Sequence, residues 1–252
     1  MAMEWYYYFA LVGVGLVAGI INAMAAGGSM LSLPFLIFFG LPANIANATN
    51  RVAILLQNIV GVNSFRQEKV FNIKTDYKLA FPAAIGAMIG ALIAVEIDPE
   101  LFEKIIGVVM FIMLLLIVFN PDAWVKKQVG VVNSKPSLIQ YIVFFFIGMY
   151  GGFIQLGVGV FLLGGLVLGC GYDLVKANAI KLFIVLVYTI FAIVIFIFYD
   201  QIDWLSGFIL ACGNMLGVWL GVKFTMKGGA KLVRYVLIAV LALTTVKLLI
   251  GL

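Results

Sequence analysis

Residues 43–64 read ANIANATNRVAILLQNIVGVNS, an apolar stretch that carries a basic residue, Arg51, eight positions after its first residue. Residues 173–198, DLVKANAIKLFIVLVYTIFAIVIFIF, form a second such stretch, in which Lys181 lies at the same depth. A helix needs about 20 residues to cross the hydrocarbon core of a bilayer, so both stretches are predicted to span a membrane with a cation about 12 Å from one end. Ionisable groups at that depth are costly and mark functional sites by default.

The composition of the whole chain agrees with a membrane protein. Of 252 residues, 65% are hydrophobic and 11% are charged, whereas soluble domains have about 45–50% and about 25%. Soluble enzymes and nucleic-acid-binding proteins are therefore excluded, and the net charge of +5 is expected to orient the chain in the membrane. The chain has no His, and Cys170 and Cys212 are too few and too far apart for a metal cage. We expect no metal and no cofactor.

The apolar segments predict an all-α polytopic fold. Full spans are predicted at 5–25, 43–64, 79–95, 101–119, 139–157, 173–198, 205–222 and 232–250. Two shorter pieces, 29–39 and 160–170, are bounded by glycine, and their length of roughly 16 Å is too short for a comfortable crossing. Each short piece is expected to be either a thin crossing or a re-entrant helix that pairs with the helix before it.

The two halves of the chain match at one constant offset of 131 residues. Gly28 corresponds to Gly159, and Ala46-Asn-Ala48 corresponds to Ala177-Asn-Ala179. Further along, Gly86-x-x-x-Gly90 corresponds to Gly217-x-x-x-Gly221. An ordered, ungapped set of matches indicates an internal repeat. We therefore divide the chain into repeat one (1–119), a linker (120–138) and repeat two (139–252).

Charge predicts that the repeats are inverted. The loop 65–78 is basic and its counterpart 199–204 is acidic, whereas 96–104 is acidic and its counterpart 223–234 is basic. By the positive-inside rule, each loop of repeat one lies opposite its counterpart in repeat two. The basic linker is then cytoplasmic, both termini are periplasmic, and each half crosses the membrane an odd number of times. Inverted repeats with interrupted helices are typical of secondary transporters.

The polar residues near the middle of the membrane predict an anion site. Arg51 and Lys181 lie one residue apart in the repeat frame, so an inverted two-fold axis brings both towards one central site. The helical spacing places Asn47, Asn50, Arg51 and Asn58 on one face, with Gln57 at its edge, and Asn178 and Lys181 on the equivalent face. The alternative is that Arg51 and Lys181 snorkel or bind nearby helix carbonyls.

The glycine-bounded helices add backbone donors to this site. A helix that begins inside the membrane presents unpaired N–H groups and a positive dipole end, which suit a small oxyanion. We expect such ends at Gly28–Ser29, beside Asn22, and at Gly159–Val160, beside Gln155. No carboxylate lies at mid-depth in any predicted span, so proton coupling would have to use the anion's own protonation or Lys181.

Several runs also resemble a known family. The run Ala18-Gly-Ile-Ile-Asn-Ala-Met-Ala-Ala-Gly-Gly-Ser-Met-Leu-Ser-Leu-Pro34, with Ala46-Asn-Ala-Thr-Asn50, resembles the first signature of the TauE/SafE sulfite exporter family. The run Gly148-Met-Tyr-Gly-Gly-Phe-Ile-Gln-Leu-Gly-Val-Gly159, with Ala177-Asn-Ala-Ile-Lys181, resembles the second. Arg51 stands where the family more often has Lys. The resemblance implies export of sulfite or organosulfonates across the bacterial inner membrane.

These observations predict an inner-membrane secondary transporter that exports a small anion, such as sulfite or sulfoacetate, by alternating access. Its partners would be this anion and membrane lipid, with no nucleic acid. The alternatives are an anion-selective channel or a carrier for another small oxyanion. A membrane enzyme is disfavoured because the chain has no His and no buried acid for general acid–base chemistry. A structural or assembly protein would not need the buried cations.

Overall fold

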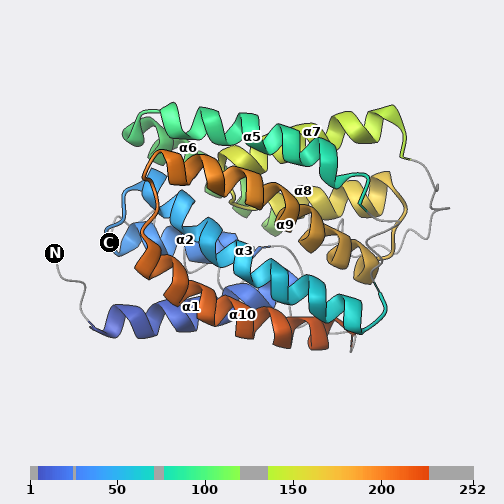
Figure 1. Ribbon diagram of the computed structural model, residues 1–252, viewed down its shortest axis with the longest axis horizontal. Coiled ribbons are helices and arrows are strands. Elements are labelled where there is room, and N and C mark those ends of the chain that lie inside the picture. Colours follow the sequence, from blue (N-terminus) through green and yellow to red (C-terminus); the bar gives the residue numbers. More distant parts are fainter. Residues whose placement is uncertain (1–4, 25–26, 71–76, 120–135, 227–252) are drawn as a thin grey trace.

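The computed structural model describes residues 5–24, 27–70, 77–119 and 136–226, and these form helices joined by short connections without any strand. The helices within residues 1–119, the predicted repeat one, are α1 (Trp5–Met24), α2 (Ser29–Phe38), α3 (Ala43–Gln67), α5 (Ala80–Glu96) and α6 (Pro99–Phe119). Those of repeat two are α7 (Leu138–Phe153), α8 (Val158–Gly164), the π-helical turn η1 (Gly165–Gly169), α9 (Leu174–Phe198) and α10 (Trp204–Met226). The long helices lie along the long axis of the molecule (Figure 1). The predicted span 232–250 lies outside the described residues, as does most of the predicted linker.

Three of the described helices are long and apolar enough to cross a membrane: Tyr6–Met24, Leu174–Phe198 and Trp204–Met226. Four shorter helices are also apolar: Ser29–Phe38, Ala80–Glu96, Leu138–Phe153 and Val158–Gly169. The helix α3 has 25 residues but is more polar, since it contains Arg51 and several asparagines. The prediction of an all-helical protein is therefore confirmed for the described part of the chain, and the three long apolar helices agree with the predicted membrane spans.

The backbone repeats at the offset of 131 residues. Both bounds of α9 lie 131 residues after the bounds of α3. Lys69 and Asp200 correspond at this offset, and both have positive φ, at 58° and 52°. Gly40 and Gly171 also correspond and have φ of 96° and 77°. In Figure 1, α3 and α9 run in opposite directions along the long axis.

Glycines set the closest helix contacts, and these contacts join the two repeats. On α10, a Cβ at Gly217 would collide with the carbonyl oxygen of Leu16 on α1. On α5, a Cβ at Gly86 would collide with the carbonyl oxygen of Phe145 on α7. Small residues at such positions let helix backbones approach closely. The helix α10 therefore packs on α1, the first helix of the chain, and α5 packs on α7, the first helix of the second half.

The connection that follows α9 and the connection that follows α3 lie at opposite ends of α3. Gln201 Nε2 donates to the Val95 carbonyl (3.3 Å), and the Asp203 N–H donates to Thr49 Oγ1 (2.9 Å), so residues 199–203 lie beside the start of α3. Lys69 follows the other end of α3, about 27 Å from Thr49 by helical rise. One buried apolar cluster includes Phe65, Leu79 and Val222, and the other includes Tyr7, Leu41 and Val95.

Large apolar side chains are exposed on the outer faces of the long helices. On α5 they include Ile85, Met88, Ile89, Leu92 and Ile93, while the opposite face of α5 carries the buried Ala83 and Ala87. A continuous exposed apolar surface of this kind fits contact with another apolar phase. The outer surface therefore agrees with a protein surrounded by lipid.

Candidate functional site

Two breaks in the helices form the centre of the site. The helix α1 ends at Met24 before α2 begins at Ser29, and α7 ends at Phe153 before α8 begins at Val158. The Ser29 hydroxyl donates to the backbone carbonyl of Gln155 (2.9 Å) and accepts from the Gly157 N–H (3.2 Å), so the two breaks contact each other. They differ from prediction in two details: α7 stops four residues before the predicted end at 157, and α8 starts at Val158 rather than Val160.

Local backbone conformation accounts for the break between α7 and α8, and a side-chain contact closes the break between α1 and α2. Ile154 is extended, with φ −128° and ψ 122°, and Gly157 is left-handed, with φ 70°, which favours glycine. The first break is closed by Asn22, whose carbonyl oxygen Oδ1 accepts from the Gly28 N–H (2.9 Å). A Cβ at Gly28 would collide with the Ala18 carbonyl, so only glycine fits there.

Arg51 on α3 holds the end of the broken helix α7. Its guanidinium donates to the carbonyls of Gly151 (3.0 Å), Gly152 (2.6 Å) and Phe153 (3.5 Å), and to Gln155 Oε1 (3.1 Å). Those carbonyls are the unpaired acceptors at the negative end of a helix, where a cation is favourable. The side chain is fully buried. Arg51 therefore binds helix carbonyls, which is the alternative that the sequence analysis had left open.

Lys181 on α9 makes the corresponding contact with α1. Its Nζ donates to the backbone carbonyl of Asn22 (2.6 Å) and to Asn178 Oδ1 (2.8 Å), and the Lys181 side chain is 2% exposed. An ammonium has three N–H donors, so these two bonds leave one donor for another acceptor. Each cation thus reaches across to the first helix of the other repeat.

Asn47 and Asn178, which correspond in the repeat, complete the two breaks. Asn47 Nδ2 donates to the Phe153 carbonyl (3.0 Å), and Asn47 Oδ1 accepts from the Gln155 N–H (3.3 Å). Asn178 Nδ2 donates to the Met24 carbonyl (3.3 Å). Buried backbone groups that have left a helix need such partners inside a membrane. Both amide nitrogens therefore donate to backbone carbonyls, whereas Asn178 Oδ1 accepts from Lys181 Nζ.

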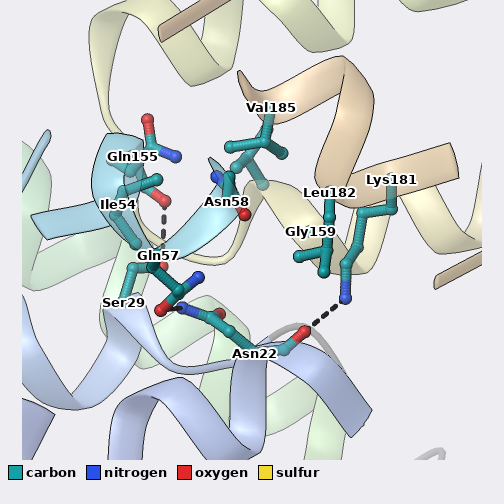
Figure 2. Close-up of a pocket in the computed structure, with 11 residues that line it drawn as sticks. Asn22, Ser29, Ile54, Gln57, Asn58, Gln155, Gly159, Lys181, Leu182 and Val185 are labelled. Carbon is teal, nitrogen blue, oxygen red and sulfur yellow. Dashed lines mark hydrogen bonds between the residues drawn. The ribbon is translucent and has the colours of Figure 1, made fainter. Parts of the chain in front are cut away.

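A small cavity lies between the two breaks and the middle of α3 and α9 (Figure 2). Its volume of about 20 Å³ would hold about one or two water molecules. The lining residues are Asn22, Ser29, Ile54, Gln57, Asn58, Gln155, Val158, Gly159, Lys181, Leu182 and Val185. Figure 2 shows the Lys181 ammonium turned towards Asn22 on one side of this space.

The structure separates the predicted site residues into two groups. Those lining the cavity are Asn22, Ser29, Gln155, Gly159 and Lys181. Those outside its lining are Gly28, Asn47, Asn50, Arg51, Val160 and Asn178. Asn50 Oδ1 accepts from the Ser32 hydroxyl (2.7 Å), and the Val160 N–H is already bonded to the Gly157 carbonyl (2.9 Å). Val160 therefore does not offer the free N–H that the sequence analysis predicted.

Two polar residues of the cavity were not among the predicted site residues. Gln57 accepts from Asn22 Nδ2 (3.1 Å), and Asn58 lines the cavity with both atoms of its carboxamide unpaired. The predicted polar face of 43–64 contains Asn58, with Gln57 at its edge, but spacing alone did not distinguish a lining residue from a packed one. In the described part of the chain, no Asp or Glu is buried, so neither buried cation has a buried carboxylate partner.

Comparison with known proteins gives a consistent relationship over most of the chain. A family model described as "Sulfite exporter TauE/SafE" matches residues 11–248. No solved structure matches this chain.

Three similar curated proteins are each described as a probable membrane transporter protein. That of Haemophilus influenzae is 27% identical over 240 residues, covering 93% of this chain and 91% of the relative. ORF9 of Sinorhizobium sp is 26% identical, covering 92% and 88%. YfcA of Escherichia coli K12 is 28% identical, covering 94% and 87%.

Proposed function

This chain belongs to the TauE/SafE sulfite exporter family of membrane transporters, and we propose that it carries a small oxyanion, sulfite or an organosulfonate such as sulfoacetate, out of the cell. The proposed place is the bacterial inner membrane, with both termini on the periplasmic side. In this proposal the cavity between the two helix breaks is the binding site, and no chemical reaction takes place there.

The observation that carries this proposal is the environment of Lys181. It is a buried cation that lines a cavity, has no buried carboxylate partner among the described residues, and keeps one N–H free. Burying a charge without a counter-charge is unfavourable, and an anion in the cavity would supply that counter-charge. Arg51 then acts as a positioning residue, because it holds Gln155 at the cavity through a 3.1 Å hydrogen bond.

Alternating access between inverted repeats is the mechanism that we propose. It is supported by the backbone features that recur at the offset of 131 residues and by the opposite directions of α3 and α9 (Figure 1). The packing suggests which helices move together: α10 lies against α1 and α3, and α5 lies against α7 and α9. The cavity lies where these two sets meet, since α3 and α9 both line it.

The size of the cavity favours a carrier over a channel. An anion with three oxygens is larger than the one or two water molecules that about 20 Å³ would hold, so binding requires movement of the surrounding side chains or helices. An open anion channel is the second candidate. Flux that saturates and is stimulated by anion on the opposite side of the membrane would support the carrier, and linear flux without such stimulation would support the channel.

The test is anion binding by the purified protein and uptake by vesicles that contain it. Sulfite, sulfate, sulfoacetate and thiosulfate are compared side by side, with wild-type protein and Lys181→Met. We expect sulfite or sulfoacetate to bind best, and Lys181→Met to weaken that binding about tenfold to a hundredfold, because a charged hydrogen bond is lost.

The matched control is Lys223→Met. This lysine is on α10, lies over the ring of Trp219 (3.4 Å) and does not line the cavity. The Lys223→Met substitution removes one positive charge, as Lys181→Met does, and should leave anion binding unchanged. Wild-type protein that neither binds nor transports any of the four anions would refute the proposed function, as would normal binding by folded Lys181→Met.

A further inference from the structure

Asn58 is a buried polar side chain for which the fold provides no partner. It lies on α3, is 1% exposed and lines the cavity, and neither its Oδ1 nor its Nδ2 has a hydrogen-bond partner. Figure 2 shows its carboxamide among the lining side chains, between Gln155 and Lys181. Buried amides in native proteins almost always have partners, so a side chain lacking all of them requires an explanation.

The other amide oxygens around the cavity are already occupied. Gln57 Oε1 accepts from Asn22, Asn22 Oδ1 accepts from Gly28, and Gln155 Oε1 accepts from Arg51. Lys181 offers only donors. Among the described side chains that line the cavity, the Asn58 oxygen is therefore the amide acceptor that has no hydrogen bond at all, and it lies beside the donors of Lys181 and of Asn58 itself. Exchanging the oxygen and nitrogen of the Asn58 amide would not change this, because both atoms are unpaired.

We propose that the site recognises an oxyanion that still carries one proton. This inference rests on the proposed function and narrows it: the favoured substrate is hydrogensulfite, whereas an organosulfonate, whose sulfonate group carries no proton, would bind less tightly. The charged oxygens of the ligand accept from Lys181 Nζ and Asn58 Nδ2, and its O–H donates to Asn58 Oδ1. An anion without a proton leaves that buried acceptor unpaired and places negatively charged oxygen against it. Sites built to bind an O–H reject close analogues that lack it for this reason.

This form of the anion also explains how a proton could cross with the substrate. The chain contains no His, and no Asp or Glu is buried among the described residues, so no ordinary proton-carrying side chain is present at the cavity. A carrier that binds the protonated anion needs none, because the proton stays bonded to the anion throughout. Lys181 is the one ionisable side chain among the residues that line the cavity.

The experiment compares a phosphonate with a sulfonate, two ligands of similar shape of which only one carries an O–H. Methylphosphonate, at a pH where it is a monoanion, and methanesulfonate have a similar shape and the same charge, but only methylphosphonate has an O–H. Binding of each to purified protein is measured at that one pH, so the protonation of Lys181 is the same in both measurements. We expect wild-type protein to bind methylphosphonate about tenfold or more tightly than methanesulfonate, as one unpaired buried acceptor would cause.

Two variants test whether Asn58 is responsible. Asn58→Leu removes both the acceptor and the donor at similar volume, so we expect the ratio of the two affinities to fall close to one. Thr189→Val is the matched control, because Thr189 corresponds to Asn58 in the repeat, is also buried with an unpartnered hydroxyl, and does not line the cavity. It should keep the wild-type ratio. The wild-type ratio tests the inference even if Asn58→Leu does not fold.

The possible outcomes separate this inference from the function on which it rests. If wild-type protein binds the two ligands equally, and Lys181→Met weakens both, the anion site stands and the selection for a protonated anion is wrong. The selection for a protonated anion by Asn58 is likewise wrong if folded Asn58→Leu keeps the preference for methylphosphonate. If neither ligand binds, and sulfite and the sulfonates do not bind either, both the inference and the proposed function are wrong.

Discussion

At the scale of single residues, Arg51 and Lys181 occupy similar depths but differ in what surrounds them. Because the Arg51 guanidinium holds three carbonyls at the end of α7, we predict that Arg51→Gln lowers the free energy of unfolding by at least about 2 kcal/mol. Arg51→Lys should recover part of this loss, since it keeps the charge but reaches fewer carbonyls. Thermal unfolding in detergent measures both variants.

A surface arginine on the same helix gives the comparison for that prediction. Arg66 is exposed in the last turn of α3, so Arg66→Gln should unfold close to wild type. If Arg51→Gln is as stable as Arg66→Gln but has lost anion binding to the same extent as Lys181→Met, then Arg51 binds the anion directly and the structural role given to it here is incorrect.

The sequence predicted where both cations lie along their helices but not their partners. Position along a helix follows from counting residues, and the repeat relates Arg51 to Lys181. What Arg51 binds depends on where α7 stops, and α7 stops at Phe153 rather than at the predicted 157. Asn58 shows the same limit: its place on a polar face is visible in the spacing, whereas its lack of a partner depends on every side chain around it.

At the scale of helices, the glycines of α1 make a sharp prediction. A Cβ at Gly19 would lie 2.8 Å from the Val218 amide nitrogen of α10, whereas a Cβ at Gly13 would have nothing within 4 Å. Gly19→Ala should therefore lower the free energy of unfolding by about 1–3 kcal/mol, as overpacked interfaces do. Gly13→Ala should be neutral or stabilising by up to about 1 kcal/mol, because alanine favours the helix.

Both substitutions are made in one helix, so their difference reports packing rather than helix propensity. Thermal unfolding of Gly13→Ala and Gly19→Ala, each against wild type, gives this difference directly. Equal stability of the two variants would mean that α1 and α10 are not held backbone to backbone.

The helix positions themselves were well predicted, because long apolar segments and the glycines at 40 and 171 mark their limits. The sequence did not predict which helix each one packs against, because a GxxxG motif predicts close packing without identifying the neighbouring helix.

At the scale of the whole molecule, the two repeats are interlocked rather than side by side. The sequence analysis divides the chain at the predicted linker, and that division stays a prediction. It does not describe the packing, because α5 packs on α7 and α10 packs on α1. Packing of helices from one half on helices of the other cannot be derived from a repeat offset, because the offset relates equivalent residues but carries no information about contacts between the two halves. The moving units of a carrier would then be mixed sets of helices.

The last prediction concerns the sides of the membrane that the two ends of the molecule face. Lys69 and Asp200 correspond in the repeat, are both exposed and have the same left-handed backbone, yet they lie at opposite ends of α3. In protein with Cys170 and Cys212 replaced by alanine, Lys69→Cys should react with a membrane-impermeant thiol reagent only from the cytoplasmic side, because its loop is basic. Asp200→Cys should react only from the periplasmic side. The matched backbone makes their intrinsic accessibility comparable, so a difference in labelling reports topology. Labelling of both positions from one side would rule out inverted repeats.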